Sequence, residues 1–238
     1  MSSGTSTDTW HFFARPWLAA LALAWTVGVI DSYSFAEYGV FTSNQAGNLV
    51  VLGNELPQDP QRATLAGLSL LGAVAGVAAA TVLQRLFAKG PWLKVAVPLV
   101  FMVMLMVVGW FLRHVVGSPP ETLVPVTSAA LAGLATAAYR TPAIQGWITA
   151  NTGAVLTTVH TAFETREERR ASAKPVQPAI MITVGFLSGA LLWGSGVFGT
   201  TDPTPVALIP TIIALVLAVV NARRSGDRTR SGRSSLGA

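Results

Sequence analysis

Neutral polar side chains surround a glycine at two places in this otherwise apolar sequence, in the segments 40–53 and 146–163. Hydroxyl, amide and free peptide groups suit a small polar or weakly charged solute better than a multivalent metal, which prefers carboxylates or imidazoles. The same groups could instead form hydrogen bonds between neighbouring helices, as polar side chains commonly do in membrane bundles. The residues that we predict to bind a solute are Asp31, Asn44, Gly47, Asn48, Asn151, Thr152 and Gly153.

Asp31 is the one carboxylate inside a predicted membrane span. An ionisable group within a span is costly and is a functional hypothesis by default. Asp31 could be a protonation or cation site, or it could pair structurally near the membrane interface. His160 could shuttle protons or simply be solvated. The sequence has no cysteine, no phosphate-cradling loop and no nucleophile–base set, so we expect neither an enzyme nor a bound metal or cofactor.

The elements that must position these residues follow from the composition. The chain has 238 residues, of which 51% are hydrophobic and only 11% are charged. A soluble domain carries about 25% charged residues, so the composition excludes a soluble globule and predicts an all-α, polytopic membrane bundle. A span needs roughly 20 apolar residues. The stretches that meet this length lie at about 16–36, 63–84, 92–112, 123–140, 176–198 and 204–222.

The basic residues predict the orientation of these six spans. All but two of the 16 lysines and arginines fall on the side that holds both termini, and the exceptions are Arg62 and Arg113. The positive-inside rule therefore predicts cytoplasmic termini in an inner (plasma) membrane. The basic charge thus reflects topology and predicts no nucleic-acid partner. The segment 223–238 is basic and rich in glycine and serine, and we expect a disordered cytoplasmic tail that follows a single membrane domain, 1–222.

The two halves of the chain resemble each other, with repeat one at about 16–115 and repeat two at about 122–222. The segment 41–48 aligns with 147–154, which pairs Gly47 with Gly153. Each half also has a glycine-rich span, marked by Gly72-x-x-x-Gly76 and by Gly185-x-x-x-Gly189. Three spans per half force the second repeat to be inverted, as in many secondary transporters.

The polar segments between the spans are predicted to be short re-entrant or broken helices. If both crossed the membrane, the basic loop around Arg85 would lie outside, against the positive-inside rule. Irregular backbone at membrane depth is tolerated where it is buried in protein or lines a cavity. In transporters such broken segments meet near the midplane and bind the solute.

A first-half motif resembles the YoaK family of bacterial inner-membrane proteins. It comprises Gly28-Val29-Ile30-Asp31-Ser32-Tyr33, then Val40-Phe41, then Ala46-Gly47-Asn48-Leu49-Val50-Val51-Leu52-Gly53, and Thr152-Gly153 matches a second-half motif. Ala46 departs from the family, which has threonine there. The resemblance covers about 16–222 and implies a six-span, small-molecule permease. The matching positions are Asp31, Gly47, Asn48, Thr152 and Gly153.

Two functions follow from these observations. The first is a permease whose solute binds where the Gly47 and Gly153 segments meet, with Asp31 as a coupling carboxylate. The second is a membrane scaffold or partner-binding subunit that transports nothing. A polar cavity at the midplane would favour the permease, and a dry, fully packed core would favour the scaffold.

Overall fold

The computed structural model describes residues 16–88, 93–139 and 176–234. These residues contain seven α-helices and no strand, which confirms the all-α prediction for this part of the chain. The helices are α1 (Pro16–Tyr38), α2 (Gln45–Glu55), α3 (Pro60–Phe87), α4 (Leu93–Phe111), α5 (Pro120–Tyr139), α8 (Val176–Gly194) and α9 (Thr204–Ser234). A π-helical turn, η2 (Leu112–Val116), continues α4.

A helix covers each of the six predicted apolar stretches. Within the described ranges, three helical stretches are long and apolar enough to cross a membrane: Trp17–Tyr38, Pro60–Phe87 and Leu93–Val116. Shorter apolar helices run over Ala179–Gly194 and Thr204–Val220. Many large apolar side chains on α3 and α4 point outward, among them Leu71, which is 66% exposed. An apolar outer surface of this extent is typical of a protein whose solvent is lipid.

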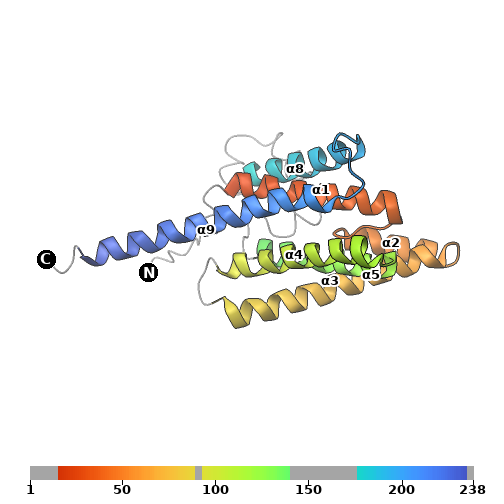
Figure 1. Cartoon of the computed structure of the whole chain (residues 1–238), viewed down its shortest axis with the longest axis horizontal. Coiled ribbons are helices and arrows are strands. Elements are labelled where there is room, and N and C mark those ends of the chain that lie inside the picture. The colour runs from red at the N-terminus through yellow and green to blue at the C-terminus, as the bar shows by residue number, and fades with distance from the viewer. Residues whose placement is uncertain (1–15, 89–92, 140–175, 235–238) are drawn as a thin grey trace, which may run out of the picture.

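The long helices form two layers (Figure 1). Helix α1 packs against α8 and α9, and helix α5 packs against α3 and α4. The first helix of each half therefore lies with the second and third helices of the other half. Between the layers, α4 contacts α9 and α1 contacts α5.

Glycines set the close approach of helices within each layer. In both glycine-rich spans, a Cβ atom on either glycine would overlap backbone atoms of the neighbouring helix. The facing pairs are Gly72 with Pro125, Gly76 with Ala129, Gly185 with Leu21 and Gly189 with Trp25. Since glycine has no side chain, α3 and α5 can touch backbone to backbone, and so can α8 and α1.

Helix α9 differs from the sequence expectation at its carboxyl end. The expected disordered tail begins at residue 223, but the helix continues to Ser234. The segment 221–230 contains several arginines and no proline, and arginine is a good helix former. Because no proline interrupts this segment, the helix continues beyond its apolar stretch and past Gly226.

Candidate functional site

The first polar segment leaves and re-enters the bundle at the same end. After α1 ends at Tyr38, Gly39 adopts a φ of 68°, a left-handed conformation that favours glycine. The chain then turns back beside α1 and begins α2. At the start of α3, Arg62 Nε donates to the Gly39 carbonyl oxygen over 2.8 Å. Because the end of α1 touches the start of α3, the short helix α2 does not cross the bundle.

Asp31 anchors the turn that precedes α2. Its carboxylate is buried and accepts four hydrogen bonds from two consecutive residues. Oδ1 accepts from the Thr42 amide over 2.9 Å, from the Thr42 hydroxyl over 3.1 Å and from the Ser43 amide over 2.8 Å. Oδ2 accepts from the Ser43 hydroxyl. Two backbone N–H groups, which no helix or strand satisfies, thus find their acceptor on α1.

Asn48 holds the same segment from α2. Its Oδ1 accepts from the Phe41 amide over 2.9 Å, and its Nδ2 donates to the Phe41 carbonyl over 2.7 Å. Nδ2 also donates to Ser69 Oγ of α3 over 2.9 Å, and Ser69 Oγ lies 2.8 Å from Ser128 Oγ of α5. Asn48 is 1% exposed. A buried polar network therefore connects the broken segment to α3 and α5.

Asn44 and Gly47 shape the start of α2. The Asn44 side chain caps the helix, because its Oδ1 accepts from the Gly47 amide over 3.1 Å. A Cβ atom on Gly47 would lie 2.8 Å from the Phe41 ring. Phe41 in turn stacks on Phe35 of α1, with ring centroids 4.7 Å apart. Gly47 thus makes room for the aromatic pair that covers the turn.

The structure brings together Asp31, Asn44, Gly47 and Asn48, the four predicted site residues that it describes. Their polar atoms are used in hydrogen bonds within the segment and to its neighbours. Residues 151–153 and 160, which carry the other predicted positions, lie outside the described residues.

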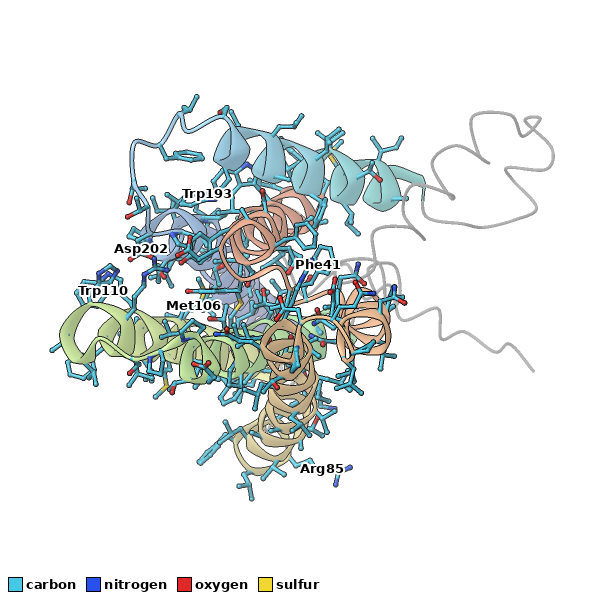
Figure 2. The ribbon with its side chains drawn as sticks, turned by 90° about the vertical axis from the view of Figure 1, so that its right-hand side faces the viewer. Phe41, Arg85, Met106, Trp110, Trp193 and Asp202 are labelled. Atoms are coloured by element: carbon cyan, nitrogen blue, oxygen red, sulfur yellow. The ribbon has the colours of Figure 1, made fainter. Side chains whose placement is uncertain are left out.

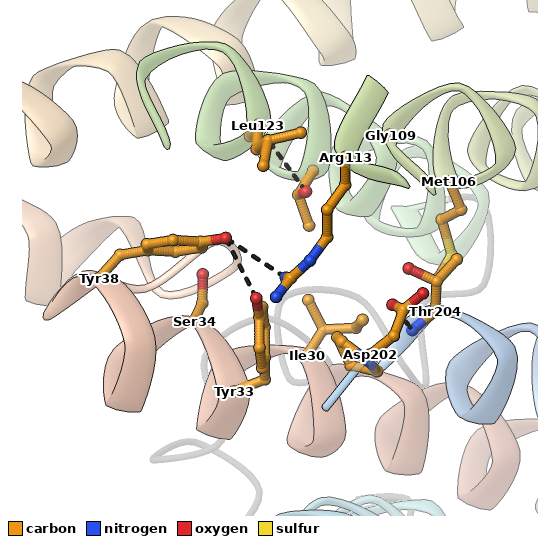
Figure 3. A pocket seen from close by; sticks show the side chains of 12 residues that line it. Ile30, Tyr33, Ser34, Tyr38, Met106, Gly109, Arg113, Leu123, Asp202 and Thr204 are labelled. Atoms are coloured by element: carbon orange, nitrogen blue, oxygen red, sulfur yellow. Dashed lines mark hydrogen bonds between the residues drawn. The ribbon is translucent and has the colours of Figure 1, made fainter. Parts of the chain in front are cut away.

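A cavity that the sequence did not predict lies between the two layers, and no residue of 39–59 lines it (Figure 3). It has a volume of about 40 Å³. One wall comes from α1 and the start of α9, and the other comes from α4, η2 and α5. In an end-on view, Asp202 and Met106 lie between the α9 and α4 ribbons (Figure 2). The lining residues that carry polar groups are Tyr33, Ser34, Tyr38, Arg113, Thr127, Asp202 and Thr204.

Arg113 and His114 of the π-helical turn reach across from one layer to the other. The Arg113 guanidinium lies 5.0 Å from the centre of the Tyr33 ring, and its Nη1 donates a long 3.5 Å hydrogen bond to the Tyr38 hydroxyl. His114 Nε2 lies 2.7 Å from Asp202 Oδ2. These contacts close one end of the space between the layers.

Sequence reasoning had one signal for this cavity. Arg113 is one of the two basic residues that the charge count leaves on the side away from the termini. Ile30 and Tyr33 belong to the first-half motif, but nothing in the sequence indicates that they lie near Arg113. The remaining lining residues come from several separate segments. The described part of the chain contains no group of three or more His, Asp or Glu side chains that could hold a metal ion.

Comparison with known proteins identifies a family. A family model described as "Protein of unknown function (DUF1275)" matches residues 19–220. This match is consistent with the resemblance carried by the first-half motif. No curated protein and no solved structure matches the chain.

Proposed function

We propose that this chain, which belongs to the DUF1275 family, is a six-span secondary transporter of a small polar solute in the bacterial inner membrane. Its two three-span repeats would be inverted relative to each other, and access would alternate as one layer rocks against the other. The observation that carries the proposal is a small cavity between the two layers, whose mostly apolar lining includes the Arg113 guanidinium and several hydroxyl groups. Each layer combines the first helix of one half with the second and third helices of the other half.

The helix contacts support the inverted repeat. In the proposed repeat, α1 corresponds to α5, α3 to α8 and α4 to α9. If each helix is replaced by its counterpart in the other half, the α1–α8 contact becomes the α5–α3 contact, and the α1–α9 contact becomes the α5–α4 contact. All four of these contacts are present in the structure. The glycine pairs follow the same exchange, because those of α3 face α5 and those of α8 face α1. A two-fold axis in the membrane plane would produce this pattern.

The ends of the helices support the proposed orientation. Arg62 and Arg113 both lie near the carboxyl end of α1, since Arg62 contacts Gly39 and Arg113 contacts Tyr38. Arg85 lies at the opposite end of α3. With the more basic end in the cytoplasm, both termini are cytoplasmic and the cavity lies toward the outer face.

In this proposal the broken segment is a rigid part of the transporter. Asp31 and Asn48 hold its free peptide groups, so they fix the segment against α1 and α3. Asn44 and Gly47 start α2 at the required place. The counterpart segment around Gly153 would take the equivalent place in the second repeat.

A membrane scaffold is the second candidate, and one observation favours it. The polar atoms of Asp31 and Asn48 are engaged by neighbouring protein groups, as expected for a network that only stabilises a bundle. The cavity between the layers favours the transporter instead, because a fully packed scaffold would leave no space there. It lies near the outer ends of the helices and not at the midplane, where the sequence predicts the solute site. An uptake screen of small polar metabolites in proteoliposomes distinguishes the two, since a scaffold transports none of them.

A cross-linking experiment tests the rocking of the layers. The natural chain has no cysteine, so an introduced pair reacts alone. His114→Cys with Asp202→Cys, joined by a short cleavable linker, would tie the layers where these side chains lie 2.7 Å apart. We expect the linked protein to lose uptake and to regain it when the linker is cleaved.

The matched control ties two helices of the same layer. The hydroxyls of Thr26 on α1 and Thr211 on α9 lie 3.3 Å apart. A disulfide formed by Thr26→Cys with Thr211→Cys should leave uptake close to that of the reduced protein. Equal loss of uptake in both linked proteins would argue against two layers that move as units.

A further inference from the structure

We propose that the cavity between the layers binds the carboxylate group of a small solute through Arg113. This inference deepens the proposed function and rests on it for the role of the site in transport, while binding itself can be measured alone. The proposed site combines the Arg113 guanidinium, carried by the turn η2 at the end of α4, with hydroxyl groups of α1 on the other side of the cavity.

Arg113 has unused hydrogen-bonding capacity. A guanidinium has five N–H donors, yet within the described ranges Arg113 makes one long hydrogen bond, to Tyr38, and no ion pair. The side chain is half-buried and points across the cavity toward Tyr33 and Tyr38 (Figure 3). Its planar fork matches the two oxygens of a carboxylate.

Asp202 does not take that place. It lines the same cavity, but its Oδ2 lies 2.7 Å from His114 Nε2 and its Oδ1 accepts from the Thr204 amide over 2.9 Å. The imidazole and the first turn of α9 therefore hold the Asp202 carboxylate. In the part of the chain that the structure describes, Arg113 is left without an acidic partner.

Ser34 is a second, independent indication of a ligand. Its side chain is 2% exposed, lines the cavity and makes no hydrogen bond to a described residue. A buried hydroxyl without a partner is costly. A carboxylate oxygen held by Arg113 would supply an acceptor on this side of the cavity. The hydroxyls of Tyr33 and Tyr38 lie 3.1 Å apart and are hydrogen-bonded to each other, so the pair offers one further donor.

The local backbone and the size of the cavity agree with this assignment. A π-helical turn is rare and occurs frequently at functional sites, and here it carries Arg113. The volume of about 40 Å³ has room for roughly three water molecules. That space accommodates a carboxylate group, whereas a phosphate ester or a sugar would require the layers to separate further.

The test measures binding of isotope-labelled acetate to the purified full chain in detergent by NMR line broadening. We expect the natural protein to bind acetate and Arg113→Gln to bind at least about 10-fold more weakly, since a hydrogen bond to a charged group is strong. Arg113→Lys keeps a charge but loses the fork, so its affinity should lie between the two. Arg85→Gln, at an exposed position at the other end of α3, should bind like the natural protein.

Several results would overturn the proposal: no acetate binding by the natural protein, equal affinity in Arg113→Gln, or an equal loss in Arg85→Gln. If Arg113→Gln does not fold, as judged by circular dichroism, Ser34→Ala and Arg113→Lys decide the question. Both should weaken acetate binding, and unchanged affinity in both would refute the site.

Uptake separates this inference from the proposed function. If acetate binding depends on Arg113 but proteoliposomes take up no solute, the binding site is supported and the transport function is refuted. If the protein takes up a neutral solute but binds no acetate, the transport function is supported and the carboxylate site is refuted.

Discussion

Replacing Asp31 by asparagine tests whether this carboxylate holds the broken segment or couples transport to an ion. In the structure it accepts four hydrogen bonds from Thr42 and Ser43. Asparagine keeps the shape but has one acceptor oxygen. Its amide group would face the Ser43 hydroxyl, which would have to turn and accept.

The expected loss of stability follows from these bonds. A hydrogen bond to a charged group contributes about 1.5–3 kcal/mol and a neutral one about 0.5–1.5 kcal/mol. If the three bonds to Oδ1 each weaken by about 1 kcal/mol, Asp31→Asn costs about 3 kcal/mol of unfolding free energy. For a chain of this size that is a decrease in Tm of about 6–12 °C. Asp31→Ala should cost more, because it leaves the Thr42 and Ser43 amides without an acceptor.

Thermal unfolding in detergent measures the effect, with Asp59→Asn as the matched control. Asp59 caps α3 at an exposed position by accepting from the Arg62 amide over 3.1 Å. Asparagine caps a helix about as well as aspartate, so this variant should unfold within about 2 °C of the natural protein. A similarly small change in Asp31→Asn, together with loss of ion-coupled uptake, would refute the anchoring role and identify a coupling carboxylate.

The remaining predictions concern packing, the network and topology. Gly72→Ala should destabilise the protein by about 1–3 kcal/mol in the thermal unfolding assay, because a Cβ there overlaps the α5 backbone. Gly67→Ala is the control: Gly67 has open space around it, so this variant should be neutral or stabilising. Asn48→Ala should cost about 2–3 kcal/mol, since it leaves the partly buried Phe41 amide without an acceptor and removes the bonds to the Phe41 carbonyl and Ser69. An unchanged Tm would contradict the network. In intact cells, Ser118→Cys should react with an impermeant thiol reagent and Ala88→Cys only after permeabilisation; the reverse pattern would overturn the proposed orientation.

The sequence predicts the long helices well because a membrane span requires about 20 consecutive apolar residues, which are easy to recognise. The six apolar stretches begin and end within a few residues of the helices that cover them, except at α9. That helix passes its apolar boundary because polar residues such as arginine propagate a helix as readily as apolar ones do. Hydropathy therefore locates the expected membrane boundary and cannot locate the end of the helix.

The candidate site is predictable only in part, for a geometric reason. Asp31, Asn44, Gly47 and Asn48 stand out because polar groups are rare in apolar segments, and they do converge. Their partners on other helices do not stand out. Ser69 and Ser128 lie within apolar spans and resemble ordinary helix residues until packing places them 2.8 Å apart. The cavity escapes prediction for the same reason, since its walls come from α1, α4, η2, α5 and the start of α9.

Two basic residues, Arg62 and Arg113, lie at the less basic end of the bundle. Under the positive-inside rule a cation on that side is disfavoured, so each needs a local reason. Arg62 has one, because its side chain binds the Gly39 carbonyl and pairs with Glu55 over 3.1 Å, which closes the broken segment. Arg113 contacts the Tyr33 ring and the Tyr38 hydroxyl but has no acidic partner among the described residues. It faces a cavity whose mostly apolar lining includes several hydroxyl groups. Because this cation has no acidic partner among the described residues, we expect it to receive an anion from outside the protein.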